Sequence, residues 1–375
     1  MKKVMVCGCG AQGSTICRRL DEEPNIEEVV CADYNLAAAE AVCKLMKKGT
    51  PKQVNAAHVD EIAKAAEGVE VRLIYDDVGS WGLGRKYLGR FRRAGVEVRC
   101  FMPVVFPWLT SHVNYRNHRK ILVVDGRVGF TGGINIAQRY ITGTKLGPWR
   151  DTHLRLEGEA VGMLQIVFIT DWFFVTKKLL ADYDKYLPKT HVRDETMIQI
   201  VTSGPDSDWA SIMQAFFSAI SHAQHHIYIS SPYFLPPAML LDALRLAARG
   251  GVRVQVMIPS CSDSPFTDLI SDSYIGDLLD AGVELYRYDN GFLHAKLLIV
   301  DEDTASVGTA NMDYRSLLDN LEVTAFIRDR SVVRALSATY DDDLASCRRI
   351  ARETWRPAAW RRTLGDALRL VSPLM

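Results

Sequence analysis

The sequence predicts an α/β protein with two pseudo-symmetric α/β halves that share one active site, preceded by a partial βαβ segment. Three observations predict this fold class. Strand-like and helix-like runs alternate along the chain, a set of motifs recurs at a constant offset, and the composition is that of a globular protein. The 375 residues are 48% hydrophobic and 24% charged, which allows a substantial core and excludes disordered and fibrous classes.

The charge balance, the hydrophobic pattern and the cysteine spacing limit the partners, the location and the metals that are expected. The 45 basic and 45 acidic residues cancel, so no nucleic-acid partner is expected. The most apolar run, Met163–Val175, is interrupted by Gln165 and Asp171, and the N-terminus has no signal-peptide pattern. No Cys or His pair has the spacing of a metal site, and no metal is expected. A soluble or peripheral cytoplasmic protein is therefore predicted.

The first segment, residues 1–67, alternates strand and helix signals and predicts a parallel sheet. The expected elements are a strand at 3–7, a helix to about residue 20, a strand at 28–32, a helix at 36–48, a strand at 53–57 and a helix at 59–66.

A glycine pattern lies in this segment between the first strand and the first helix. Gly8, Gly10 and Gly13 form G-x-G-x-x-G, and Asp33 ends the next strand twenty residues later, which is the dinucleotide-binding fingerprint. Residues 1–69 resemble the N-terminal Rossmann part of saccharopine dehydrogenase-type proteins. The resemblance implies NAD, with its pyrophosphate at the helix N-terminus and its ribose on Asp33. It ends near residue 70, so the alternative is that the segment only supplies a strand and a helix to the first half.

An internal repeat divides the rest of the chain. Residues 117–125 are similar to 293–301, and residues 132–135 are similar to 308–311, so both matches share one offset. The expected domains are a first half at 68–190, a second half at 191–345 and a basic C-terminal tail at 346–375.

Each repeat carries the pattern His-x-Lys-x4-Asp. The two copies are His118, Lys120 and Asp125, and His294, Lys296 and Asp301. Each copy runs into four apolar residues and is expected on a strand, where the His and the Lys share a face. An ammonium beside an imidazole suits a phosphate diester, because the first neutralises the oxygens and the second acts at phosphorus.

With these motifs, residues 68–375 resemble the phospholipase D superfamily, and within it the bacterial cardiolipin synthases. The similar stretches are 114–120, 130–135, 149–154, 230–234, 306–316 and 372–374. The resemblance implies a transfer of phosphatidyl groups that converts two phosphatidylglycerol molecules to cardiolipin and glycerol, without a required cofactor. His118 would attack phosphorus to form a phosphohistidine, and His294 would act as general acid and base. The diester charge would be held by Lys120, Lys296, Asn135 and Asn311.

The resemblance also implies a carboxylate that orients each imidazole and lies a few tens of residues downstream of it. Asp151 follows His118 at such a distance, and Glu322 follows His294, so these are the candidates; the alternative is that they are ordinary strand-edge carboxylates. Asp125 and Asp301 are expected to be structural anchors.

The substrate class is expected to be an anionic phospholipid at the cytoplasmic face of the membrane. Apolar loops at 101–109 and 233–237, and the tail with Trp355 and Trp360, would contact the bilayer surface; the alternatives are core packing and a docked helix. The alternative functions are a phospholipase D-type hydrolase, in which water replaces the lipid alcohol, and an inactive fusion with a residual NAD-binding segment.

Overall fold

The computed structural model describes residues 2–7, 17–18, 21–22, 24, 26–33, 36–53, 69–104, 115–190 and 196–370. The chain divides into two compact units, Met1–Pro103 and Val104–Met375, and each is described by itself.

The N-terminal unit contains two small parallel sheets. The first has the order β1 (Lys2–Cys7), β2 (Ile26–Asp33), β3 (Gly49–Gln53), with α2 (Leu36–Cys43) packed on it. The second pairs β4 (Arg72–Asp76) with β5 (Glu97–Phe101), joined through η1 (Val78–Ser80) and α4 (Arg85–Arg93). The predicted parallel arrangement is confirmed for β1, β2 and β3.

Two boundaries in this unit differ from the prediction. The second helix ends at Cys43 and not at Lys48, and the third strand begins at Gly49. The carboxylate of Asp21 accepts hydrogen bonds from the backbone N–H groups of Lys47 and Lys48, which fixes a turn where the helix was expected to continue. Asp33 is the last residue of β2. Gly8, Gly10 and Gly13, residues 54–57 and the helix expected at 59–66 lie outside the described residues.

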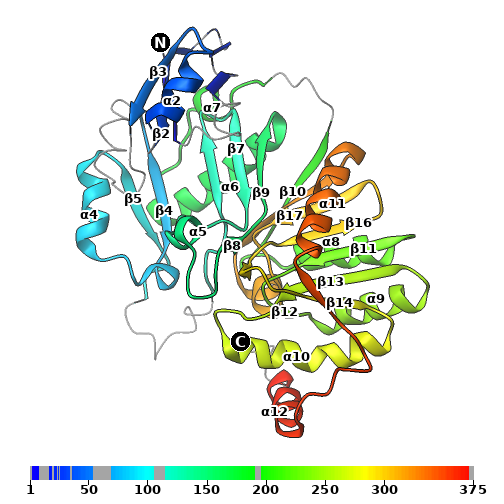
Figure 1. The fold of residues 1–375 in the computed structure, drawn as a ribbon. Helices are drawn as coiled ribbons and strands as arrows, with labels where there is room; N and C mark the ends of the chain where they lie inside the picture. The colour runs from blue at the N-terminus through cyan, green and yellow to red at the C-terminus, as the bar shows by residue number, and fades with distance from the viewer. Residues whose placement is uncertain are drawn as a thin grey trace. The chain divides into compact units, whose positions relative to one another are not determined.

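The larger unit is built on a mixed eight-stranded sheet with the order β10-β19-β17-β16-β11-β13-β14-β20 (Figure 1). Its strands are β10 (Met197–Ser203), β11 (His226–Ser230), β13 (Arg253–Pro259), β14 (Glu284–Tyr288), β16 (Leu297–Val300), β17 (Thr304–Gly308), β19 (Glu322–Arg328) and β20 (Cys347–Ile350). The helices beside it are α8 (Ser211–Ser221), α9 (Ala238–Arg249), α10 (Pro265–Asp280) and α11 (Arg330–Leu344).

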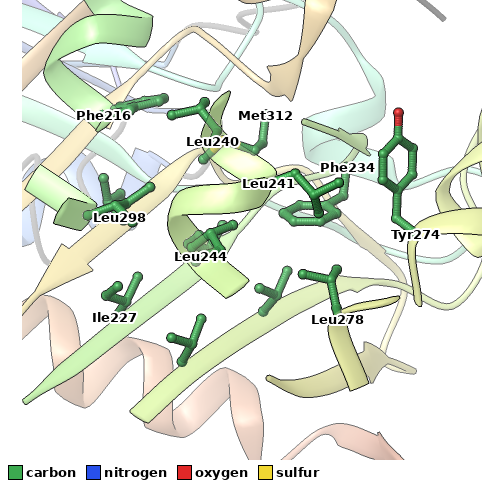
Figure 2. Close-up of a cluster of buried hydrophobic side chains, with 14 of the residues drawn as sticks. Phe216, Ile227, Phe234, Leu240, Leu241, Leu244, Tyr274, Leu278, Leu298 and Met312 are labelled. Carbon is green, nitrogen blue, oxygen red and sulfur yellow. The ribbon is translucent and has the colours of Figure 1, made fainter. Parts of the chain in front are cut away.

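Helices cover both faces of this sheet, so its central strands are apolar on both sides. Alternate side chains such as Ile227 and Leu298 pack with α8, α9 and α10 in the cluster that Figure 2 shows. Their neighbours along the strands, such as Ile299, face α11 and its Tyr340. Burying one such aliphatic side chain contributes about 2 kcal/mol to the free energy of unfolding. This core holds β16 in place, and the second motif directly precedes that strand.

The three-stranded antiparallel sheet of the same unit repeats part of this architecture. It has the order β6 (Ile121–Val124), β7 (Val128–Gly132), β9 (His153–Glu157). Strands β6 and β7 precede β16 and β17 by the same offset as the motifs. Asp125 and Asp301 occupy the same left-handed turn position, with φ of 54° and 53°. The repeat read from the sequence is therefore a structural repeat.

Helix α6 (Glu159–Thr176) packs on β6, β7, β9 and β10. Among the described residues it is the one helix long and apolar enough, by length and composition alone, to cross a membrane. It carries the buried Asp171, which forms an ion pair within the unit, so we treat α6 as a structural helix of this unit.

The C-terminal residues are attached to the larger unit. Strand β20 pairs antiparallel with β14, and α12 (Ala359–Arg369) packs on α10. Arg369 binds Asp277 across this contact with an N···O distance of 2.8 Å. The structure thus has the docked helix that was one of the two interpretations of the tail.

The loop at 233–237 is core and not a membrane segment. Its Phe234 and Leu235 form β12, which pairs with β18 (Met312–Asp313), and both side chains are buried in the cluster of Figure 2. The loop expected at 101–109 is described only to Val104.

Candidate active site

The two His-x-Lys segments are extended but lie just ahead of the strands on which they were expected. β6 and β16 each begin one residue after the lysine. Each lysine turns back onto its own histidine: Lys120 Nζ donates to the His118 carbonyl at 2.6 Å, and Lys296 Nζ donates to the His294 carbonyl at 2.5 Å. Lys296 Nζ also lies 2.8 Å from His294 Nδ1, so the predicted pairing of ammonium and imidazole is present in the second copy. In the first copy the charge of Lys120 is close enough to lower the pKa of His118.

The orienting carboxylates are exchanged between the halves. His118 Nδ1 lies 2.8 Å from Glu322 Oε1, and His294 Nδ1 lies 2.7 Å from Asp151 Oδ2. The sequence separation suggested the opposite pairing, within each half, and that expectation is wrong. Each imidazole is oriented by a side chain of the other repeat.

Backbone hydrogen bonds explain the exchange. The His118 N–H donates to the Leu321 carbonyl at 2.9 Å, one residue before Glu322. The His294 N–H donates to the Arg150 carbonyl at 2.7 Å, one residue before Asp151. Each motif is thus a short parallel partner of the segment that leads into the other half's carboxylate, as β15 (Phe292–Leu293) and β8 (Trp149–Arg150) are paired.

Glu322 is held as a buried, ionised carboxylate. It accepts the hydroxyl hydrogen of Thr309, and the Asn320 amide lies 3.4 Å away. Burial alone would raise the pKa of Glu322, but the charge of His118 and the hydrogen bond to it hold that pKa below its ordinary value. The imidazole of His118 therefore faces a carboxylate whose charged form is favoured.

Asp151 differs from Glu322 in its electrostatics. Its side chain is 2% exposed, and burial raises its pKa to about 6 although the Lys296 charge and the Thr152 N–H lower it. Gly133 lies against it, and a Cβ atom at that glycine would collide with the Asp151 carboxylate. The second glycine of the 132–135 motif is required for this close approach.

The charged groups of the two motifs affect each other's pKa values. Burial lowers the pKa of His294 well below its ordinary value, and the charges of Lys296, Lys120 and His118 lower it further. Burial likewise lowers the pKa of His118, where Glu322 opposes the effect and both lysines add to it. Burial lowers the pKa of Lys296 to about 8, against the carboxylates of Asp151 and Glu322.

The two asparagines assigned to the diester charge are at the site but engaged. Asn135 Nδ2 donates to the Tyr140 hydroxyl at 3.1 Å, and Asn311 Nδ2 donates to the Ser316 hydroxyl at 3.1 Å. Asn311 Oδ1 is buried and has no hydrogen-bond partner among the described residues.

Sequence reasoning missed an aromatic wall around His294. The Tyr140 hydroxyl lies 3.0 Å from His294 Nδ1, and the rings of Trp149 and Phe292 have centroids 5.1 and 5.7 Å from the imidazole. Trp149 opens one of the family-like stretches, which was a signal for it. Nothing in the pattern around Tyr140 distinguished it from a surface residue.

Residues beside His118 are held by a buried carboxylate of α6. Arg119 forms a buried ion pair with Asp171 at 2.7 Å, and Asn117 donates to the same carboxylate at 2.9 Å.

The last residue of each motif, Asp125 or Asp301, has a contact or position of its own. Asp301 accepts hydrogen bonds from the three consecutive backbone N–H groups of residues 224–226. This contact is that of a structural anchor, and Asp125 occupies the equivalent turn.

The donor set does not suggest a metal centre. Within the ranges that the structure describes, no group of three or more His, Cys, Asp or Glu side chains could hold a metal ion.

Comparison with known proteins identifies the family. The family model described as "Cardiolipin synthase, PLD-like domain" matches residues 46–145 and 216–344. A cardiolipin synthase of Staphylococcus aureus (strain Mu50) is 42% identical over 321 residues, covering 84% of this chain and 65% of the relative. The major cardiolipin synthase of Bacillus subtilis (strain 168) is 44% identical over 318 residues, covering 84% of this chain and 66% of the relative. The chain thus spans about two thirds of the length of these relatives.

A solved structure shares the fold. The crystal structure of phosphatidylserine synthase from Haemophilus influenzae Rd KW20 superposes with a TM-score of 0.61 at 13% identity, covering 85% of this chain and 94% of that one. Together with the family match, this establishes the phospholipase D-like α/β fold that the resemblance implied. The chain belongs to the cardiolipin synthase family of phospholipase D-like proteins.

Proposed function

We propose that this chain is a phosphatidyltransferase of the cardiolipin synthase type, which converts two phosphatidylglycerol molecules to cardiolipin and glycerol through a phosphohistidine. The observation that carries the proposal is the crossed pair of imidazole–carboxylate contacts, His118 with Glu322 and His294 with Asp151. Two oriented imidazoles and two lysines in one site supply a nucleophile, an acid and charge stabilisation for one phosphate diester.

His118 is the proposed nucleophile. Its Nδ1–H donates to the ionised Glu322, which leaves Nε2 with a free lone pair for phosphorus. Its side chain is 30% exposed, whereas that of His294 is 7% exposed, so His118 is the more accessible ring.

His294 is the proposed general acid and base. Burial and the charges of the lysines hold its pKa well below the ordinary value. A bound phosphate diester brings a negative charge close to the ring, which raises this pKa and favours the imidazolium. His294 is thereby protonated when substrate arrives and can give its proton to the departing alcohol.

The two half-reactions balance as follows. A bond forms between His118 Nε2 and phosphorus while the bond from phosphorus to the glycerol oxygen breaks, and His294 gives that oxygen its proton. The hydroxyl of a second phosphatidylglycerol then returns a proton to His294 as its oxygen bonds to phosphorus and the nitrogen–phosphorus bond breaks. Lys120 and Lys296 stabilise the charge on the phosphoryl oxygens in both steps.

The lipid substrate is proposed to come from an anionic membrane surface to which the protein binds peripherally. The exposed Trp360 on the docked helix α12 and the neighbouring Arg362 offer an aromatic and basic surface of the kind that binds anionic lipid.

A product assay tests this function. The full chain is incubated with phosphatidylglycerol vesicles, and glycerol, cardiolipin and phosphatidic acid are quantified. Cardiolipin with one glycerol released per molecule is expected, and His118→Asn or His294→Asn should abolish it. His222→Asn, an exposed histidine after α8, is the matched control and should leave the rate unchanged. Phosphatidic acid as the only product would refute the transferase and favour a hydrolase.

A further inference from the structure

A tyrosine and a carboxylate outside the His-x-Lys motifs form a fixed pair in the larger unit. Tyr233 lies between β11 and β12, and Asp263 lies in the loop between β13 and α10. The Tyr233 hydroxyl donates to Asp263 Oδ1 at 2.5 Å. Neither residue has a role in the chemistry described above.

The pair borders the active site on the side of His294. The Tyr233 ring lies 6.5 Å from the Phe292 ring, which lies 5.7 Å from the imidazole of His294. Burial lowers the pKa of Lys296, and Asp263 contributes the smallest of the opposing effects, after Asp151, Glu322 and Asp313. The pair is therefore one ring away from the proposed general acid and close enough for Lys296 to sense its charge.

The loop that carries Asp263 is held by hydrogen bonds from its serines. The Ser262 N–H donates to Asp268 at 3.0 Å, the Ser262 hydroxyl donates to the Ser264 carbonyl at 3.0 Å, and Ser264 caps α10 through the Thr267 N–H at 3.3 Å. Asp263 itself is exposed between the buried Ser262 and the half-buried Ser264. A side chain on a loop fixed in this way is pre-organised for a ligand.

The charge of Asp263 is unfavourable for the substrate phosphate. Asp263 forms its hydrogen bond with the neutral Tyr233 hydroxyl, and a carboxylate near the site repels a phosphate diester. Its Oδ2 and the lone pairs of the Tyr233 oxygen accept hydrogen bonds only, because the phenol proton is already donated to Oδ1. A ligand at this pair must therefore supply hydrogen-bond donors.

We infer that Tyr233 and Asp263 form the alcohol subsite, which binds the hydroxyl groups of a glycerol head group. This inference rests on the proposed transferase function. The departing glycerol and the incoming glycerol head group both exchange a proton with His294, so one subsite beside that ring serves both half-reactions. Its effect is to favour a polyol over water as the acceptor for the phosphohistidine.

Acceptor competition tests the subsite. The full chain is given phosphatidylglycerol vesicles diluted in phosphatidylcholine, with free glycerol or 1-propanol added, and the products of transfer to each alcohol and to water are quantified. Asp263→Asn and Tyr233→Phe should lower the ratio of glycerol transfer to hydrolysis roughly tenfold, the effect of weakening one hydrogen bond to a charged group. The ratio of 1-propanol transfer to hydrolysis should stay the same in both variants. A general structural defect would not leave this ratio unchanged while lowering the glycerol ratio. Asp341→Asn, an exposed aspartate on α11, is the control and should keep the wild-type ratios.

Each outcome decides the matter. Unchanged ratios in both variants would overturn the subsite while leaving the transferase intact. A wild-type chain that transfers to no alcohol would refute the proposed function and the subsite with it. If ethanolamine, added in the same way, competes with glycerol and loses its advantage in Asp263→Asn, the pair is an ammonium site and the inference is wrong.

Discussion

Replacing Lys296 with methionine should stabilise the fold while abolishing activity. The residue is 4% exposed, and burial lowers the pKa of its ammonium from 10.5 to about 8. At about 1.4 kcal/mol per pKa unit, keeping the charge costs the folded state about 3 kcal/mol at pH 7. Methionine has a similar length but cannot donate to the His294 carbonyl. The loss of this hydrogen bond lowers the free energy of unfolding by about 1 kcal/mol. The expected net increase in the free energy of unfolding is therefore about 2 kcal/mol.

The pH dependence of the free energy of unfolding provides a second test of this prediction. Because the pKa of Lys296 is lower in the folded state, the unfolded chain binds more protons between about pH 8 and 10.5, and wild-type stability should rise through that window by the contribution of this residue. Urea denaturation at pH 7 and pH 10 measures both effects, with Lys178→Met, an exposed lysine after α6, as the control. A Lys296→Met variant less stable than the wild type at pH 7, or equally pH-dependent above pH 8, would refute the reasoning.

Three further outcomes follow from the crossed site. Glu322→Gln should slow formation of the covalent intermediate by roughly 10²–10⁴-fold, because it removes the charge that orients His118 from the other repeat; single-turnover glycerol release measures this step. The rate should fall as the pH drops through about 6, because Asp151 then takes a proton and no longer accepts a hydrogen bond from His294. A pH–rate profile of Asp151→Asn should lack this fall at low pH. Gly133→Ala should lose activity and about 1–3 kcal/mol of stability by thermal denaturation, because its Cβ meets the Asp151 carboxylate, whereas Gly82→Ala, in open space, should be nearly neutral.

Each of these outcomes can fail separately. A Glu322→Gln variant that forms the intermediate at the wild-type rate would contradict the crossed pairing. A profile for Asp151→Asn that matches the wild type at low pH would assign the acid limb to another group. An active, stable Gly133→Ala protein would contradict the close approach.

The paired motifs and the repeat could be read from the sequence because they are local. One short stretch of chain contains the His, Lys and Asp of each motif, and the offset between the two stretches carries over to the starts of β6 and β16. Alternation along an extended chain then places each lysine beside its histidine. These features need no knowledge of which segments meet in space.

The carboxylate partners could not be assigned because they depend on non-local pairing. Asp151 and Glu322 were recognised by their spacing, but spacing alone favours a partner in the same half. The backbone contacts of His118 with Leu321 and of His294 with Arg150 decide otherwise. The early end of α2 has a similar cause, since the carboxylate of Asp21 binds the distant backbone of Lys47.

Trapping the covalent intermediate tests the central claim most directly. Wild-type protein is mixed with phosphatidylglycerol labelled in its phosphate, quenched at alkaline pH during turnover, and digested for peptide mapping. A phosphatidyl group on His118 is predicted, absent in His118→Asn. Label on His294 would reverse the roles of the two rings, and cardiolipin formation without any labelled histidine would contradict the two-step mechanism.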